Sequence, residues 1–373
     1  MLLYPVYALL FADAGLSTGA ISSLFAIWSI VSFLAEVPSG ALADRWSQRG
    51  LFAVGAGVTA SGYALWILWP AYPGFALGFV LWGIGGACAS GTLEALVYDH
   101  LGSPDYARVM GRAGTAGILA MLAATLLAAP VYAVGGYRLV GIASVATVTL
   151  GGLLALRLPP AVSGTPEAVP EPSEPLGDAG VVTDSGPSTY AATLREGLRA
   201  SVRNRRVVWA VVIAALVPGF TALDEYLPLL SREKGAATTV VPLLYALTAL
   251  AMAAGSAVAG RFPDLAPRRL AALLALAAAL VAAGALTRSL LGMAAVSAAF
   301  GLLQFALILT ETRLQEAITG RARTTVLSIS GFLSEVFAVA LYGLFALDAP
   351  LPALFALSAL PLAATALATA RHL

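Results

Sequence analysis

The chain has few of the residues from which enzymes build active sites. Among its 373 residues there are one cysteine and two histidines, and charged residues make up only 11%. The single cysteine, Cys88, excludes an internal disulfide and a cysteine-based metal cluster. We find no His-x-x-His, His-Glu-x-x-His, Gly-x-Ser-x-Gly or Gly-x-x-x-x-Gly-Lys-[Ser/Thr] motif. These absences weigh against an enzyme, a metal site, a cofactor and ATP hydrolysis by this chain.

Apolar runs of membrane-spanning length dominate the sequence instead. Hydrophobic residues make up 59% of the chain and the mean hydropathy is +0.87. A helix needs about 20 apolar residues to cross a bilayer. We expect spans at 1–12, 16–42, 51–70, 73–98, 113–134, 137–157, 207–231, 239–261, 269–288, 290–312, 324–347 and 351–370. The sequence therefore predicts an all-α polytopic membrane protein.

The first of these runs is shorter than the others. Residues 1–12 would cover only about half of a bilayer at a rise of about 1.5 Å per residue. The run is either a re-entrant stub or the visible part of a span that begins upstream of Met1. We expect a truncated first helix, because two similar halves would each need six whole spans.

One short signature occurs twice, 220 residues apart. Gly40, Asp44 and Arg49 follow one apolar run, and Gly260, Asp264 and Arg269 follow another with the same spacing. A chain built from two similar membrane halves is typical of secondary transporters, which move a substrate between the halves.

Basic residues fall mostly on one side of the predicted membrane. If the loop at 44–50 is cytoplasmic and the spans alternate from there, 17 basic residues lie inside and 4 outside. The outside set is Arg138, Arg232, Lys234 and Arg288. Because cytoplasmic loops carry an excess of Arg and Lys, we expect a multi-pass protein of the cell membrane. Its central linker and its C-terminus are expected in the cytoplasm.

A polar segment separates the two halves. Residues 158–194 contain seven prolines, five acids and no basic residue, a composition that predicts a disordered linker. The basic amphipathic stretch 195–206 either lies on the inner leaflet or extends the next span as a helix. The expected domains are therefore a six-helix half at 1–157, the linker, the basic helix, and a second half at 207–373.

These features together resemble the major facilitator superfamily. Its loop motif reads roughly G-x-L-A-D-R-x-G-R-[RK], and the match is at Gly40, Leu42, Ala43, Asp44, Arg45 and Arg49. The chain departs from the motif at Ser47 and Gln48. The run Glu36-Val-Pro38-Ser39-Gly40 is similar to a drug-efflux and unassigned permease subgroup of that family.

The resemblance implies a fold and a mechanism. The fold would consist of two six-helix halves related by a pseudo-two-fold axis, which rock about a central site in alternating access. It further implies a monomer in the lipid bilayer that binds a small-molecule substrate and protons, without nucleic acid.

Three acidic residues are candidates for proton coupling. Glu335 lies about 16 Å into its span, near the midplane, with no basic residue within a turn. Asp224 and Glu225 lie in the outer part of 207–231, where helical geometry would turn only one of them toward a cavity. The alternatives are a protonated Glu335 bonded between helices, and a hydrated Asp224–Glu225 pair bonded to Arg232. An ionised group at mid-bilayer costs about 2.5–3.5 kcal/mol, so each acid needs a partner.

Charged residues also gather at the cytoplasmic ends of the spans. The resemblance implies that they form inter-helix bridges that close an inner gate, whereas the alternative is static packing of helix ends. The expected gate residues are Glu36, Gly40, Asp44, Arg45, Arg49, Glu94, Asp99, Arg112, Asp264, Glu311, Arg313 and Arg323.

The resemblance implies that four spans line the substrate cavity. Their central residues include Tyr4, Tyr7, Ser90, Phe220, Thr221, Gln304 and Phe305, although aromatic side chains there can equally serve helix packing. No Arg or Lys stands at mid-depth to hold an anionic substrate. We therefore expect proton-coupled efflux (antiport) of small lipophilic compounds. The alternative is a proton symporter or facilitator for uptake of a small nutrient.

Overall fold

The computed structural model describes residues 1–43, 46–90, 92–159, 205–318, 323–347 and 349–372. Within these ranges only the backbone is described at 37, 41, 93–95, 98–99, 101–107 and 323–325. The described residues form helices and no strand. Predictions about Asp44, Arg45 and most of 158–206 lie outside the described residues, as do those about the Glu94, Asp99 and Arg323 side chains.

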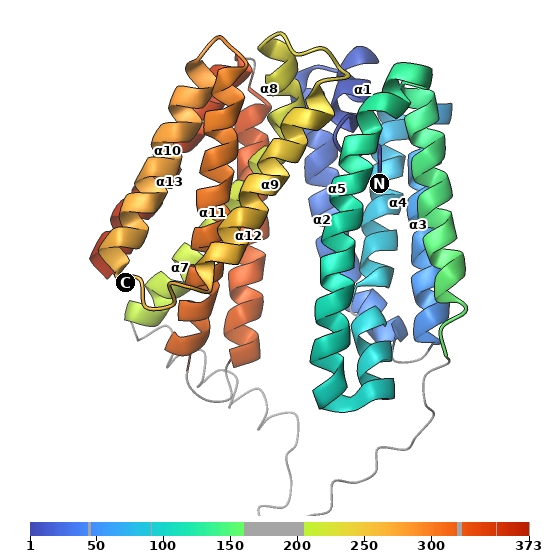
Figure 1. The fold of residues 1–373 in the computed structure, drawn as a ribbon, viewed down its shortest axis with the longest axis horizontal. Coiled ribbons are helices and arrows are strands. Elements are labelled where there is room, and N and C mark those ends of the chain that lie inside the picture. The colour runs from blue at the N-terminus through green and yellow to red at the C-terminus, as the bar shows by residue number, and fades with distance from the viewer. Residues whose placement is uncertain (44–45, 91, 160–204, 319–322, 348, 373) are drawn as a thin grey trace, which may run out of the picture.

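Two bundles of helices stand side by side (Figure 1). The N-terminal bundle contains α1 (Tyr7–Asp13), α2 (Thr18–Ala43), α3 (Gln48–Leu68), α4 (Tyr72–Ala89) and α5 (Thr92–Ala155). The C-terminal bundle contains α7 (Arg205–Gly219), the 3-10 helix η1 (Phe220–Tyr226), α8 (Leu227–Glu233), α9 (Val241–Ala259), α10 (Pro267–Leu286), α11 (Leu291–Ala317), α12 (Arg323–Phe345) and α13 (Leu351–His372).

The helices of the described residues account for eleven of the twelve predicted membrane spans, and the first predicted run, 1–12, contains most of the short α1. Among the described residues, 10 helical stretches are long and apolar enough to cross a bilayer. One of them, Arg108–Ala155, has 48 residues and covers both spans expected at 113–134 and 137–157. Gly136 has a φ of 58° within this stretch, and α5 folds back on itself in Figure 1. The prediction of a multi-pass, all-α membrane protein is confirmed.

Two predicted spans are not continuous helices. The span expected at 73–98 is interrupted at Ser90, whose backbone is extended at a φ of −63° and a ψ of 132°. The span expected at 207–231 changes from α-helix to 3-10 helix after Gly219 and returns to α-helix at Leu227. Pro218 explains the second change, because a proline inside a helix has no N–H for the preceding turn.

Glycines let α3 and α4 approach closely. A side chain at Gly55 would place its first carbon 2.6 Å from the carbonyl oxygen of Gly85. A side chain at Gly85 would meet the Thr59 hydroxyl, and would lie 2.5 Å from the carbonyl oxygen of Gly55. In lipid, where apolar burial drives helix association weakly, such small-residue contacts hold helices together.

We expect Gly85→Ala to lower stability and Gly86→Ala to preserve or raise it. The new methyl group at Gly85 displaces backbone, at a cost of about 1–3 kcal/mol. Alanine gains about 1 kcal/mol over glycine in a helix, so the net loss at this position is about 1 kcal/mol. At Gly86 nothing lies within 4 Å of the added carbon. The thermal unfolding midpoints of the two purified variants test this, and equal midpoints would refute the close-packing argument.

Candidate functional site at the interface of the bundles

The two ends of the molecule differ in charge and in packing. We call the end where Arg49, Arg157 and Arg206 lie the basic end, and the end that carries α1 and α8 the opposite end. The bundles converge at the opposite end and separate toward the basic end (Figure 1). Residues 111–121 of α5, toward the basic end, are exposed on every face of the helix. The structure therefore represents a state that is closed at the opposite end.

Contacts between α2 and α12 show where the closed part stops. Ser29 donates a hydrogen bond to Glu335, and the rings of Phe33 and Phe332 lie 5.4 Å apart. One residue further along α2, Leu34 is 65% exposed. The bundles therefore touch along the half of α2 nearer the opposite end and separate at about its middle.

Asp224 and Glu225 lie in this closed region and both contact tyrosines. The Tyr245 hydroxyl of α9 donates to Asp224 at 3.0 Å, and the Tyr4 hydroxyl donates to Glu225 at 3.3 Å. The rings of Tyr4 and Tyr245 contact each other edge to face at 5.7 Å. The sequence predicts that only one of the two acids faces the centre, but the 3-10 geometry of η1 turns both toward this tyrosine pair.

The tyrosine contacts join the two bundles. Tyr4 precedes α1 in the N-terminal bundle, whereas Glu225 belongs to the C-terminal bundle and is only 9% exposed. The Tyr226 hydroxyl, next in the chain, donates to Ser22 of α2 at 2.7 Å. Among the bonds found for the described residues, none gives Asp224 or Glu225 a cationic partner. Arg232 bonds Asp13 instead, so the expected Arg232 contact with the Asp224–Glu225 pair is not formed.

Glu335 occupies a different position from the pair. Its side chain is exposed and lines a cavity of about 370 Å³ between α7, α11 and α12. Pro218, Glu311 and Ser334 line the same cavity. Glu335 therefore lies where the contact between the bundles ends. Its carboxylate accepts a hydrogen bond from Ser29 of the N-terminal bundle.

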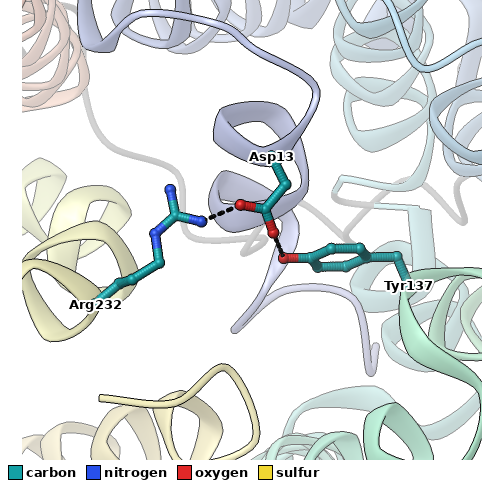
Figure 2. A network of polar contacts seen from close by, with 3 residues as sticks. All are labelled: Asp13, Tyr137 and Arg232. Atoms are coloured by element: carbon teal, nitrogen blue, oxygen red, sulfur yellow. Dashed lines mark hydrogen bonds and ion pairs between the residues drawn. The ribbon is translucent and has the colours of Figure 1, made fainter. Parts of the chain in front are cut away.

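A polar network closes the opposite end (Figure 2). Arg232 of α8 forms an ion pair with Asp13 of α1, and the Tyr137 hydroxyl of α5 donates to the same carboxylate at 2.5 Å. We call these three residues the outer latch. Asp13 and Tyr137 were not predicted from the sequence. Asp13 is the one acid in residues 1–35, and it could have been matched with the few basic residues of the outside set.

The predicted gate residues of the basic end do not bridge the bundles in this conformation, as far as the described side chains show. Arg49 donates to the Leu158 carbonyl oxygen at 3.0 Å, and Arg313 donates to the Leu265 carbonyl oxygen. Glu36, Gly40, Arg112, Asp264 and Glu311 are exposed. This arrangement agrees with a basic end that is open. The gating role of these residues stays a prediction for the state in which the basic end is closed.

The predicted cavity residues divide by burial. Tyr7, Phe220 and Phe305 are buried among other side chains, Tyr7 with Trp66 and Phe79 around it and Phe220 against Phe337. Tyr4, Thr221 and Gln304 are partly exposed and Ser90 is exposed. Tyr4 is the residue of this set that contacts a carboxylate, and it also contacts the ring of Trp82 at 6.3 Å. Among the described residues, no group of three or more His, Cys, Asp or Glu could hold a metal ion.

Solved structures of membrane transporters have the same fold. A bacterial homologue of the human lysosomal transporter Spinster, in an inward-facing and unoccupied conformation, superposes with a TM-score of 0.66 at 16% identity. The match covers 99% of this chain and 90% of that one. The nucleoside transporter NupG superposes with a TM-score of 0.70 at 12% identity, over 98% of this chain and 93% of that one.

A third structure and a family model complete the comparison. A D-xylose–proton symporter superposes with a TM-score of 0.67 at 15% identity, over 97% of this chain and 92% of that one. No curated protein sequence matches. The model that describes the Major Facilitator Superfamily matches residues 1–342. With two helical bundles that meet around a polar interface, the chain belongs to the major facilitator superfamily and is a secondary transporter rather than an enzyme.

Proposed function

We propose that this protein exports small lipophilic compounds across the cell membrane in exchange for protons. The observation that carries the proposal is the pair of adjacent carboxyl groups, Asp224 and Glu225, at the interface of the bundles. The excess of arginine at the basic end supports its placement in the cytoplasm. In that orientation the described state is open to the cytoplasm.

Charge compensation explains why Glu225 is suited to carry a proton. An ionised carboxylate within the bilayer needs a cation, water or several hydrogen-bond donors. The described contacts supply Glu225 with one tyrosine hydroxyl at 3.3 Å. Binding a proton removes the charge that has to be compensated, so the closed interface forms most readily around a neutral Glu225. Proton binding and closure of the opposite end are thereby linked.

The direction of proton movement depends on which contacts of Glu225 break when the bundles separate. When the bundles separate at the opposite end, Glu225 loses Tyr4 and meets external water, from which it takes a proton. Closure then returns it to the tyrosine pair, beside the partly exposed Asp224. Asp224 and, further toward the cytoplasm, Glu335 offer acceptors for the proton on its way out of the interface. Asp224, Glu225 and Glu335 are thus candidate proton carriers in series.

The proposed substrate class follows from the aromatic surroundings of the carboxyl pair. Tyr4, Tyr245 and Trp82 form edge-to-face contacts next to it. Aromatic faces beside acids attract lipophilic cations and accept neutral apolar compounds. A compound that leaves this site as a proton arrives would be exchanged for it.

Proton movement in proteoliposomes tests the proposal. A pH-sensitive dye is enclosed, a pH gradient is imposed, and tetraphenylphosphonium and other lipophilic cations and neutral drugs are added one at a time. We expect compound-dependent proton flux opposite in direction to the compound. Flux in the same direction would support proton-coupled uptake instead. Absence of flux with every compound would refute export of lipophilic compounds.

A further inference from the structure

A second cavity lies at the basic end, away from the interface of the bundles. Its volume is about 640 Å³, and it forms where α7 begins, where α11 and α13 end, and where the loop at 260–266 leads into α10. Its charged and polar lining consists of Arg206, Asp264, Arg313, Glu316 and His372. The ends of spanning helices lie at the depth of the lipid headgroups.

The rim of this cavity is basic. The lining itself contains two arginines and two acids, with His372 in addition. Four further arginines, all exposed, lie within two positions of lining residues in the chain: Arg205, Arg268, Arg269 and Arg371. Together, six arginines and two acids lie in or near the cavity, and an excess of positive charge attracts anions. The surroundings therefore favour an anion.

Arg313 offers unused hydrogen-bond donors to such an anion. One terminal nitrogen, Nη2, donates to the Leu265 carbonyl oxygen, which fixes the guanidinium against the 260–266 loop. The other, Nη1, is buried and has no hydrogen-bond partner among the described groups. Buried donors in proteins nearly always have a partner, and a guanidinium forms its strongest bonds with carboxylate and phosphate oxygens. Arg313 lines the cavity, so a phosphate oxygen bound against its guanidinium would supply the acceptor that Nη1 lacks.

The start of α10 adds to the same attraction. This helix of 20 residues begins at Pro267 without a side-chain cap, and Ala266 and Pro267 both line the cavity. An uncapped helix start carries partial positive charge and is a common place for phosphate to bind. The helix start and the Arg313 guanidinium belong to different elements, so they favour an anion independently.

We propose that this cavity binds the phosphate headgroup of an anionic phospholipid. Basic cavities between membrane helices on the cytoplasmic side suit such headgroups. Asp264 and Glu316 offset part of the positive charge, so the site fits a single phosphodiester better than a polyphosphate. The bound lipid would tie the ends of α7, α11 and α13 to the start of α10. The proposal depends neither on the transported compound nor on proton coupling.

Thermal unfolding with short-chain lipids tests this site. The purified protein in a neutral detergent is titrated with dioctanoyl phosphatidylglycerol, with the matching phosphatidylethanolamine and phosphatidylcholine, and with inorganic phosphate. We expect a saturable rise of the unfolding midpoint with phosphatidylglycerol alone. In Arg313→Gln the concentration that gives half of the rise should increase about tenfold or more, because one charge-assisted hydrogen-bonding group is lost.

Two further variants make the test specific. Arg268→Gln with Arg269→Gln changes only exposed rim residues, and it should also weaken the effect of phosphatidylglycerol even if Arg313→Gln fails to fold. Arg157→Gln, an exposed arginine at the basic end of the other bundle, should keep the full effect. An equal rise with the ethanolamine or choline lipid would overturn the proposal, as would an undiminished rise in the rim variant. A full rise with inorganic phosphate would assign the cavity to a free anion instead.

Discussion

Glu225→Gln is expected to lower proton-driven transport by about one to two orders of magnitude while leaving the protein folded. Glutamine keeps the size of the side chain and can still accept the hydrogen bond from Tyr4, but it cannot take up or release a proton. Coupling free energies between two ligands are typically 1–3 kcal/mol, or about 5- to 150-fold in affinity. We therefore expect compound-dependent proton flux in proteoliposomes to fall by about one to two orders of magnitude. The measurement is the initial rate of the enclosed pH dye.

An assay of substrate exchange without net proton movement distinguishes a loss of proton coupling from a loss of folding. Counterflow between labelled and unlabelled compound needs the bundles to move but needs no net proton transfer, so Glu225→Gln should retain it. Glu233→Gln is the matched control, since Glu233 is exposed on the neighbouring α8, and both activities should be unchanged. Normal proton flux in Glu225→Gln would remove this residue from the mechanism. If Glu335→Gln then lost flux, the coupling site would move to the cavity between α7, α11 and α12.

Asp13→Asn is expected to open the opposite end of the transporter more often. The closed state contains the ion pair with Arg232 and the 2.5 Å bond from Tyr137, both of which end on the Asp13 carboxylate. The Arg232 and Asp13 side chains are 33% and 44% exposed, so solvent screening limits the contribution of the pair to about 1 kcal/mol or less. Loss of the negative charge and of one of the two acceptor oxygens should raise the ratio of open to closed molecules about fivefold.

A distance measurement across the opposite end can detect this shift. Spin labels at Val134 of α5 and Leu291 of α11, which are 84% and 81% exposed, report the separation of the bundles in a Cys88→Ser background. Asp13→Asn should add a population at longer distance. Exchanging the charges, with Asp13→Arg and Arg232→Asp in one protein, should restore most of the short-distance population.

A control and a contrary outcome complete this test. Arg138→Gln, which changes an exposed arginine of the same end next to Tyr137, should leave the distances as they are. If Asp13→Asn also left them unchanged, the outer latch would contribute nothing to closure. The closed opposite end would then be stabilised by the contacts of Tyr226 with Ser22 and of Tyr4 with Glu225.

Hydropathy could predict the helices of this protein because insertion into a bilayer is a local property. A run of about 20 apolar residues is stable as a helix in lipid whatever its neighbours are. The interruptions of two helices, at Ser90 and after Pro218, were not predicted in this way. A hydropathy average does not detect a single residue that leaves the helical conformation.

Three residues of the candidate site, Tyr4, Asp224 and Glu225, were predicted from the sequence, whereas Tyr245 and the contacts between these residues were not. Asp224, Glu225 and Tyr4 were recognisable because acids and tyrosines are rare within apolar spans. That Tyr4 meets Glu225, 221 residues away, depends on the rotation of each helix and on the 3-10 geometry of η1. The expectation that only one acid of the pair would face the centre was wrong because it assumed regular α-helical geometry.

By itself, the sequence determined that this protein spans a membrane many times, that it is built from two related halves, and which of its ends is basic. These properties follow from composition within short segments and from the repeated Gly-Asp-Arg loop. Only the tertiary structure decided that Asp13 pairs with Arg232, that Ser29 reaches Glu335 across 306 residues, and that the opposite end is the closed one. Such pairs form between helices that the chain brings together from distant positions. They change when the bundles move, so no local property of the sequence encodes them.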